Sequence, residues 1–299
     1  MKHRFLKTIA VAFPLSIALV LGAKFATLAH MRSQLDFSLP AGKHVLVLGN
    51  SHGRDAVCDS LLTGWANRCA DGEMYCGAYL LAERFFAQNR IDTLVVNLSS
   101  FDINPDVSVN TSYLLFKSSR MAIANEEVLA DLAALNWRDL LTFYCLNDVY
   151  TLLQPVETGG YERWNHHGLA KELVDLDFRL ARDGRVELPR TPIADFSMQT
   201  TYIKKIADLC NRHHVALVLL NYPKYERDKY FIQSMAWDVY TTLGDGFTIA
   251  DYENFVFPDT SYYANTTHLN YLGAECFSQS IKRHGLHTLA PRRWRTTRK

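Results

Sequence analysis

Two polar residues, far apart in the sequence, stand in contexts that suit acyl-transfer chemistry. Ser51 follows an apolar, β-branched run that stops at Gly49, and the residues after it are compatible with a helix. A turn of this kind between a strand and a helix presents a hydroxyl at the rim of an α/β fold. Serine is a weak nucleophile until a base takes its proton. We take His268, near the end of the chain, as the candidate base.

Each residue also has an ordinary structural interpretation. Serine is a preferred N-cap, so Ser51 could simply begin a helix, and His268 could do the same near the end of the chain. Asn50 either bonds to backbone within the turn, its common use, or donates to a substrate. We interpret His52 as a loop residue that packs beside the site. The presence of both contexts in one chain favours the pairing of nucleophile and base.

The elements expected around these residues are those of an α/β domain. Apolar runs typical of buried strands alternate with helical patterns, which predicts a parallel sheet covered on both faces. A short strand over residues 73–76, before Gly77, would complete a sheet of about five strands. We therefore expect a three-layer α/β/α sandwich. The other strands are predicted over residues 44–48, 93–98, 216–220 and 247–250, and the helices over 54–65, 78–88, 126–135, 137–153, 196–213, 229–243 and 269–284.

The N-terminal segment is apolar enough to cross a bilayer. Residues 8–29 carry one charge, Lys24, which can snorkel to the interface, and basic residues precede them. About 20 apolar residues span the hydrocarbon core, and positive residues favour the cytoplasmic side. We expect a single-pass anchor in the inner (cytoplasmic) membrane, with the globular part periplasmic or otherwise extracytoplasmic. A cleaved signal segment is the alternative, although residues 27–29 fit a cleavage site only loosely.

The expected organisation places one large domain after this anchor. Residues 1–32 form a cytoplasmic stub and the anchor (or signal segment), and residues 33–43 form a linker. Residues 44–285 form the α/β domain, long enough for its own core, and residues 286–299 form a basic tail. The polar stretch around residues 154–192 interrupts the strand–helix rhythm. It is either a loop or cap beside the active face or a disordered surface excursion.

Composition argues against several function classes. A formal net charge of +1 is not typical of a nucleic-acid binder. The paired histidines at residues 166–167 and 213–214 have no acidic partner at ligand spacing, so we expect no metal and no other cofactor. The cysteines are too few for a disulfide scaffold. Pairing of Cys58 with Cys69 or Cys76 stays open beside the alternative of buried free thiols.

The surroundings of Ser51 and His268 resemble two sequence blocks of the SGNH/GDSL hydrolase family, in particular its membrane-anchored bacterial branch. The stretch Gly49-Asn50-Ser51-His52 is similar to the family's Gly-Asp-Ser block, with asparagine in place of aspartate. The stretch from His268 to Ala274, His-Leu-Asn-x-x-Gly-Ala, is similar to the block before the last helix. The resemblance extends from Val45 to about Ile281, but within this range it is confined to short, separate stretches. It implies Ser51 as nucleophile, His268 as base, and the N–H groups of Ser51 and Gly77 as oxyanion donors.

Two positions depart from the family's pattern. Its third block supplies an asparagine that donates to the oxyanion, and here only the final Asp102 of that block is kept. Ser99, Ser100 or backbone N–H groups would have to serve, and losing one such donor costs about 10²–10³ in rate. The position three before His268 is Asn265 instead of aspartate, a change that costs about 10⁴ in a serine protease. Asp259 or a backbone carbonyl is the alternative group to orient the imidazole.

The resemblance implies transfer of an acyl group from an ester to water or to a sugar hydroxyl. We expect the substrate to be an acylated carbohydrate, with O-acyl (most simply acetyl) groups on an envelope or exported polysaccharide. The alternative from another class is a catalytically degenerate relative that binds glycan or scaffolds an envelope assembly, and the two departures motivate it. A third interpretation, a lipid or thioester hydrolase, follows from the anchor.

Overall fold

The structure is a computed structural model, and it describes most of the sheet, its helices and the N-terminal helix. The described residues are 2–98, 118–146, 197–225, 247–252, 257, 260–265, 267–286 and 288–289. The chain forms two compact units, one from residues 1–37 and 109–158 and the other from residues 38–108 and 159–299. Ser99, Ser100, Asp259 and the insertion around residues 154–192 lie outside the described residues.

A six-stranded sheet forms the centre of the second unit. Its order is β2-β1-β3-β4-β5-β6, with the first five strands parallel and β6 antiparallel to β5. The prediction of a parallel sheet of about five strands is confirmed. The strands are β1 (Val45–Leu48), β2 (Trp65–Asn67), β3 (Thr93–Asn97), β4 (Ala216–Asn221), β5 (Thr248–Asp251) and β6 (Thr288–Leu289).

The edge strand lies elsewhere than the sequence pattern indicated. The strand predicted over residues 73–76 is wrong, because α3 (Tyr75–Gln88) begins there with Met74 as its N-cap residue. The N–H of Ala78 donates to the carbonyl of Met74 at 2.9 Å, which closes a helical turn. The strand at this edge is instead β2, which pairs with β1 and begins at Trp65, the last residue of the helix predicted over residues 54–65.

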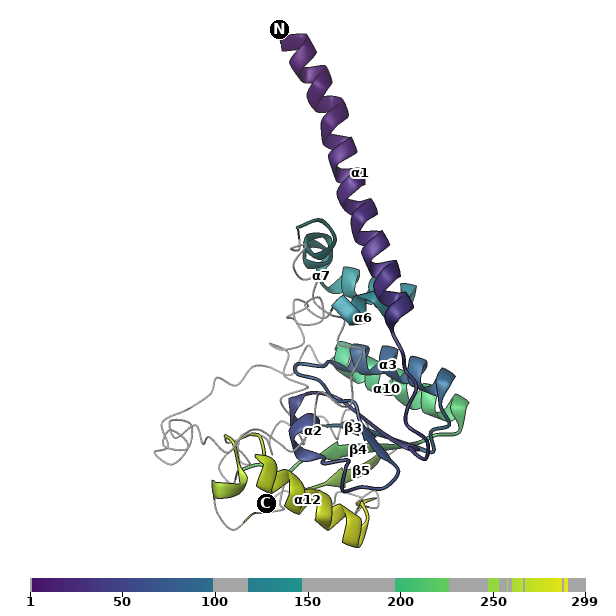
Figure 1. The fold of residues 1–299 in the computed structure, drawn as a ribbon, viewed down its shortest axis with the longest axis vertical. Coiled ribbons are helices and arrows are strands. Elements are labelled where there is room, and N and C mark those ends of the chain that lie inside the picture. Colours follow the sequence, from purple (N-terminus) through teal and green to yellow (C-terminus); the bar gives the residue numbers. More distant parts are fainter. Residues whose placement is uncertain are drawn as a thin grey trace, which may run out of the picture. The chain divides into compact units, whose positions relative to one another are not determined.

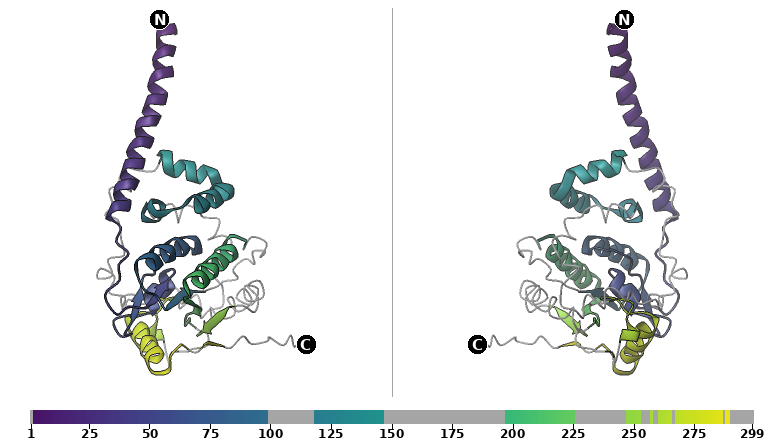
Figure 2. Two further views of the ribbon diagram at one scale, coloured as in Figure 1. Left: turned by 90° about the vertical axis from the view of Figure 1, so that its right-hand side faces the viewer. Right: turned by 90° about the vertical axis from the view of Figure 1, so that its left-hand side faces the viewer.

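Helices cover both faces of the sheet. On one face α3 packs against α10 (Ser197–His213), and on the other α2 (Ser51–Ala56) packs against α12 (Tyr271–His284) (Figures 1 and 2). The central strands β1 and β3 are almost entirely buried, as parallel strands covered on both sides must be. The predicted three-layer α/β/α sandwich is therefore present.

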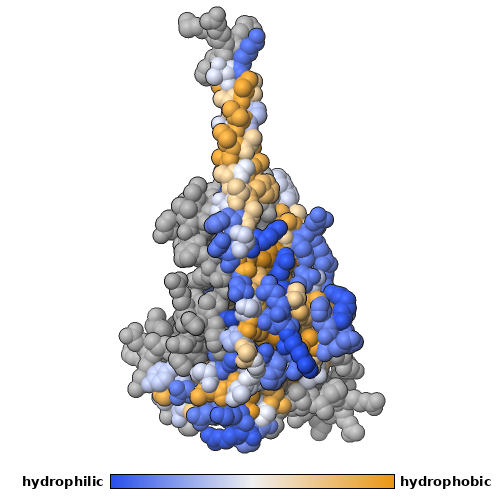
Figure 3. Space-filling view, turned by 45° about the vertical axis from the view of Figure 1, so that its right-hand side comes forward, coloured by the Kyte–Doolittle hydropathy of each residue, from blue (hydrophilic) through white to orange (hydrophobic). Residues whose placement is uncertain are grey.

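The first unit contains three described helices: α1 (Lys2–Gln34), α6 (Ser118–Ile123) and α7 (Glu126–Leu146). The part of α1 from Lys7 to Gln34 is long and apolar enough to cross a membrane, with a mean hydropathy of 2.0 in its most apolar window. Figure 3 shows apolar side chains along this helix. α7 is one continuous helix, although the sequence pattern predicted two helices over residues 126–135 and 137–153.

Candidate active site

The sheet order brings the ends of β1 and β3 together at the position where α/β proteins bind ligands. The chain goes from β1 to β2 on one side, and β3 then pairs with β1 on the other side. Ligands of open α/β sheets bind outside the carboxyl ends of the strands at such a switch point. Asn50 and Ser51 follow β1, and Asn97 is the last residue of β3.

Ser51 and His268 meet at this edge, as the nucleophile–base hypothesis requires. Ser51 is the first residue of α2, and His268 lies between the short helix η2 (Thr260–Tyr262) and α12. Their side chains form a hydrogen bond, with Ser51 Oγ 2.8 Å from His268 Nε2. Both residues are partly buried, so each is held by protein and still reaches the surface. This distance suits proton transfer from hydroxyl to imidazole.

Asn265 decides which nitrogen of His268 carries the proton. Its Oδ1 accepts from the backbone N–H groups of Thr267 at 2.9 Å and His268 at 2.8 Å, which identifies this atom as the oxygen. His268 Nδ1 lies 3.0 Å from the same Oδ1, which can only accept, so Nδ1 carries a proton. Nε2 is then left as the acceptor for the hydroxyl proton of Ser51. Thr267 Oγ1, 3.0 Å from Nδ1, lies beside the same nitrogen.

Asn50 and Asn97 hold the turn between β1 and α2, here called the nucleophile turn, through a pair of hydrogen bonds. The N–H of Asn50 donates to Asn97 Oδ1 at 3.0 Å, and Asn97 Nδ2 donates to Asn50 Oδ1 at 2.7 Å. Asn50 Oδ1 also accepts from the N–H of His52 at 3.0 Å, which makes Asn50 the N-cap of α2. Of the two roles left open for Asn50, the bond to backbone within the turn is present, and Ser51 does not itself serve as the cap.

Gly49 makes this pairing sterically possible. Its φ of +141° is one that side chains rarely adopt, and a Cβ on it would lie 1.1 Å from Asn97 Oδ1. The glycine before the serine therefore leaves room for the amide of β3.

His52 lies in α2, not in the loop expected for it, and its ring stacks on that of His268. The ring centroids are 4.5 Å apart and the planes differ by 6°. His52 is buried, and its Nδ1 lies 3.1 Å from Asn50 Oδ1, an acceptor, so this nitrogen carries a proton. One face of the candidate base is thus covered by a second imidazole.

Both imidazoles are neutral at neutral pH. Burial lowers the pKa of His268 from its usual 6.5 to about 4, and the nearby positive charge of Arg54 lowers it as well, while Asp71 acts in the opposite direction. Burial lowers the pKa of His52 well below its usual value, and the positive charges of Lys224 and of His268, when that ring is protonated, lower it further. Arg54 is itself paired with Asp55, with Nε–Oδ1 at 2.7 Å, and with Asp71. A neutral His268 is ready to accept a proton.

Of the other residues expected in the site, only Gly77 is described. It lies, buried, in the first turn of α3, so the short strand expected before it is absent and its N–H belongs to a helix start. Ser99, Ser100 and Asp259 lie outside the described residues. The cysteines for which pairing stayed open, Cys58, Cys69 and Cys76, are buried, and no disulfide joins them in the part of the chain that the structure describes.

Sequence reasoning missed Asn97 as a site residue. Its signal is an amide at the carboxyl end of an otherwise apolar strand, which lies in the sheet beside the strand that Gly49 follows. The stacking of His52 on His268 has no comparable signal, because it depends on how α2 and the loop before α12 approach each other.

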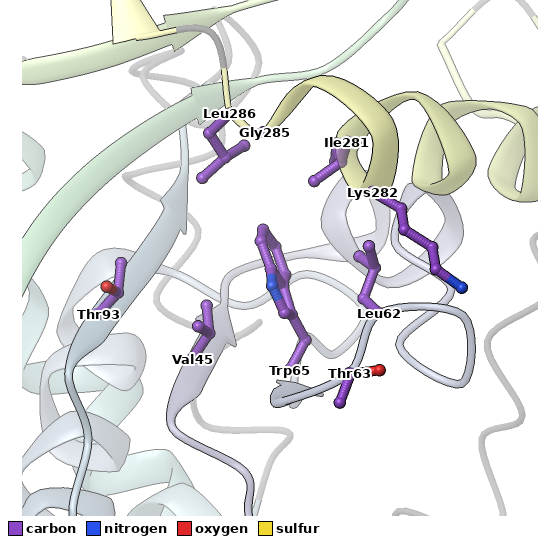
Figure 4. A pocket seen from close by; sticks show the side chains of 9 residues that line it. All are labelled: Val45, Leu62, Thr63, Trp65, Thr93, Ile281, Lys282, Gly285 and Leu286. Atoms are coloured by element: carbon purple, nitrogen blue, oxygen red, sulfur yellow. The ribbon is translucent and has the colours of Figure 1, made fainter.

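A cavity of about 330 Å³ lies at the amino-terminal ends of the strands, opposite to the ends that carry the candidate active site (Figure 4). The first residues of β1, β2 and β3, which are Val45, Trp65 and Thr93, line it together with the end of α12. Because Ser51 follows the opposite end of β1, this cavity is separate from the candidate active site.

No protein-family model matches the chain, and no curated protein sequence matches it. Solved structures similar to the chain include a candidate platelet activating factor from Streptococcus pneumoniae, with 13% identity over 92% of this chain and 98% of that chain and a TM-score of 0.43. A candidate acylhydrolase from Bacteroides fragilis has 11% identity over 85% and 92%, with a TM-score of 0.38. A GDSL-like lipase from Bacteroides thetaiotaomicron has 11% identity over 86% and 97%, with a TM-score of 0.37.

These TM-scores are below 0.5, so the fold class rests on this chain's own sheet order and layers. The order β2-β1-β3-β4-β5 within an α/β/α sandwich defines a doubly wound α/β fold, the class that the strand and helix pattern of the sequence predicts.

Proposed function

We propose that this protein is a serine-dependent ester hydrolase or O-acyltransferase. The observation that carries this proposal is the 2.8 Å hydrogen bond between Ser51 Oγ and His268 Nε2. It is strengthened by the Nδ1 contact with Asn265, which leaves Nε2 free to act as base. A serine with an adjacent, oriented base is the arrangement that nucleophilic catalysis requires.

The proposed reaction proceeds through an acyl-enzyme. His268 Nε2 takes the proton of Ser51 as Oγ forms a bond to the ester carbonyl carbon, and the carbonyl oxygen becomes an oxyanion. When the intermediate collapses, the bond to the leaving alkoxide breaks and His268 returns the proton to it. Water or a sugar hydroxyl then attacks the acyl-enzyme as His268 takes its proton. The bond between the acyl carbon and Ser51 Oγ breaks, and His268 returns the proton to Oγ. Candidate donors to the oxyanion are the N–H groups of Ser51 and Gly77 and the hydroxyls of Ser99 or Ser100.

Asn265 makes the expected enzyme slower than one with a carboxylate at this position. Its amide oxygen orients His268 through the 3.0 Å contact, but it carries no charge to stabilise the imidazolium that forms during catalysis. The lowered pKa of His268, about 4, also reduces its strength as a base.

The proposed substrate is an acylated carbohydrate at a membrane surface. An apolar α1 of sufficient length supports an inner-membrane anchor, with the second unit on the periplasmic or extracytoplasmic side. We propose O-acyl groups, acetyl in the simplest case, of an envelope or exported polysaccharide as the target. The family resemblance of the Ser51 and His268 blocks supports this substrate class.

A second candidate function is glycan binding or scaffolding without catalysis. Asn265 and the absence of an asparagine in the third block favour it, because both departures remove transition-state stabilisation. A lipid or thioester hydrolase is a third candidate, favoured by α1 alone.

Hydrolysis of p-nitrophenyl acetate by the detergent-solubilised full chain separates these candidates. The hydrolase proposal predicts turnover that Ser51→Ala abolishes while the unfolding transition stays the same. Equal slow turnover by both proteins would contradict it and favour a binding protein. A preference for long acyl esters over acetate would favour the lipid substrate instead.

A further inference from the structure

The exposed large apolar side chains of the described residues gather in one place. There are ten of them, and all belong to the first unit: eight on α1 and two, Leu135 and Trp137, on α7. The second unit exposes none among its described residues. A soluble surface rarely concentrates such residues in this way, and a contiguous set marks contact with lipid or with a partner.

Exposure along α1 changes where a membrane-spanning segment would leave the bilayer. The large apolar side chains that are exposed between Ile9 and Phe25 have values of 42% to 68%, whereas the one charged side chain there, Lys24, is buried at 4%. Farther along the helix, Leu28 at 8% and Met31 at 2% are buried as well. The exposed apolar side chains up to Phe25 therefore suit lipid, and Lys24 and the residues from Leu28 onward suit contact with protein.

α6 and α7 pack on α1 at this change. Leu28 and Met31 of α1 form an apolar cluster with Ala122 of α6, and Leu129 and Leu140 of α7 pack against it. Arg32 Nε donates to the carbonyl of Ala122 at 2.6 Å, which fixes α6 to the same part of α1. α7 is thus attached to α1 at the level where its lipid-compatible part ends.

The direction of α7 and its exposed residues suit the membrane–water boundary. Figure 1 shows α7 nearly end-on beside α1, and Figure 2 shows it from the side, so α7 runs across α1. Trp137 is 59% exposed and Leu135 is 41% exposed, and the guanidinium of Arg138 lies 5.6 Å from the centre of the Trp137 ring. Tryptophan with a neighbouring cationic side chain is the composition that membrane interfaces favour.

We propose that α7 lies in the interface of the bilayer that α1 spans, with Leu135 and Trp137 in the boundary between headgroups and acyl chains and Arg138 directed to lipid phosphates. The partner is the lipid surface itself. The proposal rests on insertion of α1 and does not depend on whether Ser51 is catalytic. It explains why, among the described residues, the exposed large apolar side chains outside α1 lie on α7. This helix packs against the part of α1 where the segment proposed to lie in lipid ends.

The test uses the full chain in phospholipid vesicles with Trp137 as its single tryptophan. We expect lipids brominated near the headgroup end of the acyl chains to quench its emission by about half or more, because interfacial helices lie roughly 5–10 Å deep. Leu135→Glu in the same chain is the matched variant and should reduce this quenching. The substituted residues are Trp65→Phe, Trp164→Phe, Trp237→Phe and Trp294→Phe.

Three results would overturn the proposal. Free access of acrylamide to Trp137 without quenching by brominated lipid would place the residue in water. Protection from both quenchers would show that protein covers it. Extraction of the full chain by alkaline carbonate would show that α1 is not inserted in the bilayer. This result would leave the hydrolase proposal untouched, because labelling of Ser51 needs no membrane.

Discussion

At the scale of single residues, amide side chains do the positioning that carboxylates do in many hydrolases. Asn50 and Asn97 hold the nucleophile turn, and Asn265 orients the base. Each amide oxygen accepts a backbone N–H, so its orientation is determined by the fold. The arrangement supplies geometry without negative charge beside the imidazole.

Replacing Asn265 by aspartate should therefore increase activity. A carboxylate can accept the same backbone N–H groups, and it adds the charge that stabilises an imidazolium on His268. We expect kcat to rise by about tenfold or more and the pKa of His268 to rise. The pH dependence of p-nitrophenyl acetate hydrolysis measures both. An unchanged pKa with unchanged kcat would show that Asn265 does not face the working base, and Asn265→Ala, which should lose activity, is the control.

The pKa of His268 should also set the pH dependence of the proposed hydrolysis by the unsubstituted chain. Its imidazole must be neutral to accept the proton of Ser51, and burial lowers its pKa to about 4. Activity should thus increase as pH rises through about 4 and stay level from there to neutral pH. An inflection of kcat/KM near 6.5, the usual histidine value, would contradict the buried environment described for this ring.

The same lowered pKa values link stability to pH. His52 and His268 bind protons less readily in the folded chain than in the unfolded chain, so protonation favours unfolding. We expect the free energy of unfolding to be highest above the unfolded pKa of about 6.5 and to fall as pH drops toward about 4. Urea unfolding at several pH values measures this. A smaller loss in the His52→Phe variant would assign part of the effect to His52.

His52 should stabilise the charge that forms on His268 during catalysis. The two rings are stacked at 4.5 Å, and a cation over an aromatic face gains about 0.5–2 kcal/mol. We expect His52→Leu to lower kcat by about twofold to thirtyfold with little change in KM, since this range follows from the same energy. His52→Phe keeps an aromatic face and should lie closer to the parent. Equal kcat values in the two variants would argue against a role for the ring face.

At the scale of elements, the turn from β1 to α2 is the part of the fold on which the site depends most. Gly49 has a φ of +141°, and a Cβ at this residue would clash with Asn97 Oδ1. Any side chain at this position must displace the amide that pairs with Asn50.

Gly49→Ala should consequently cost about 2–4 kcal/mol of unfolding free energy, because backbone strain adds to the loss of buried hydrogen bonds. Gly42→Ala is the matched control. Its φ is +82°, also in the left-handed region, but nothing lies within 4 Å of the added Cβ. It should cost about 1 kcal/mol. Equal losses in the two variants, measured by urea unfolding, would show that the contact with Asn97 is unimportant.

The sequence predicts a strand reliably only when enough consecutive residues show the apolar, β-branched pattern. The runs at β1, β3, β4 and β5 are apolar and β-branched, and each was predicted within one or two residues of its observed bounds. β2 has only three residues, too few for a period to show, and the apolar Tyr75 and Cys76 that suggested a strand belong to the first turn of α3.

The candidate site divides in the same way. Ser51 and His268 could be found because each stands in a local pattern, whereas Asn97 could not, since its role requires the close approach of β3 to Gly49.

At the scale of the whole molecule, the chain separates two kinds of surface between its two units. The described residues of the first unit expose large apolar side chains and those of the second expose none. Ser51 and His268 both belong to the second unit, so the hydrogen bond between them is made within that unit.

Reaction with a fluorophosphonate probe shows whether Ser51 is a nucleophile activated by His268. We expect covalent labelling at Ser51 in the full chain, loss of labelling in Ser51→Ala, and strong reduction in His268→Ala with the fold retained. Mass spectrometry of the labelled peptide identifies the modified residue. An unlabelled, folded chain at neutral pH, or labelling of Ser51 that is equally fast without His268, would contradict the account.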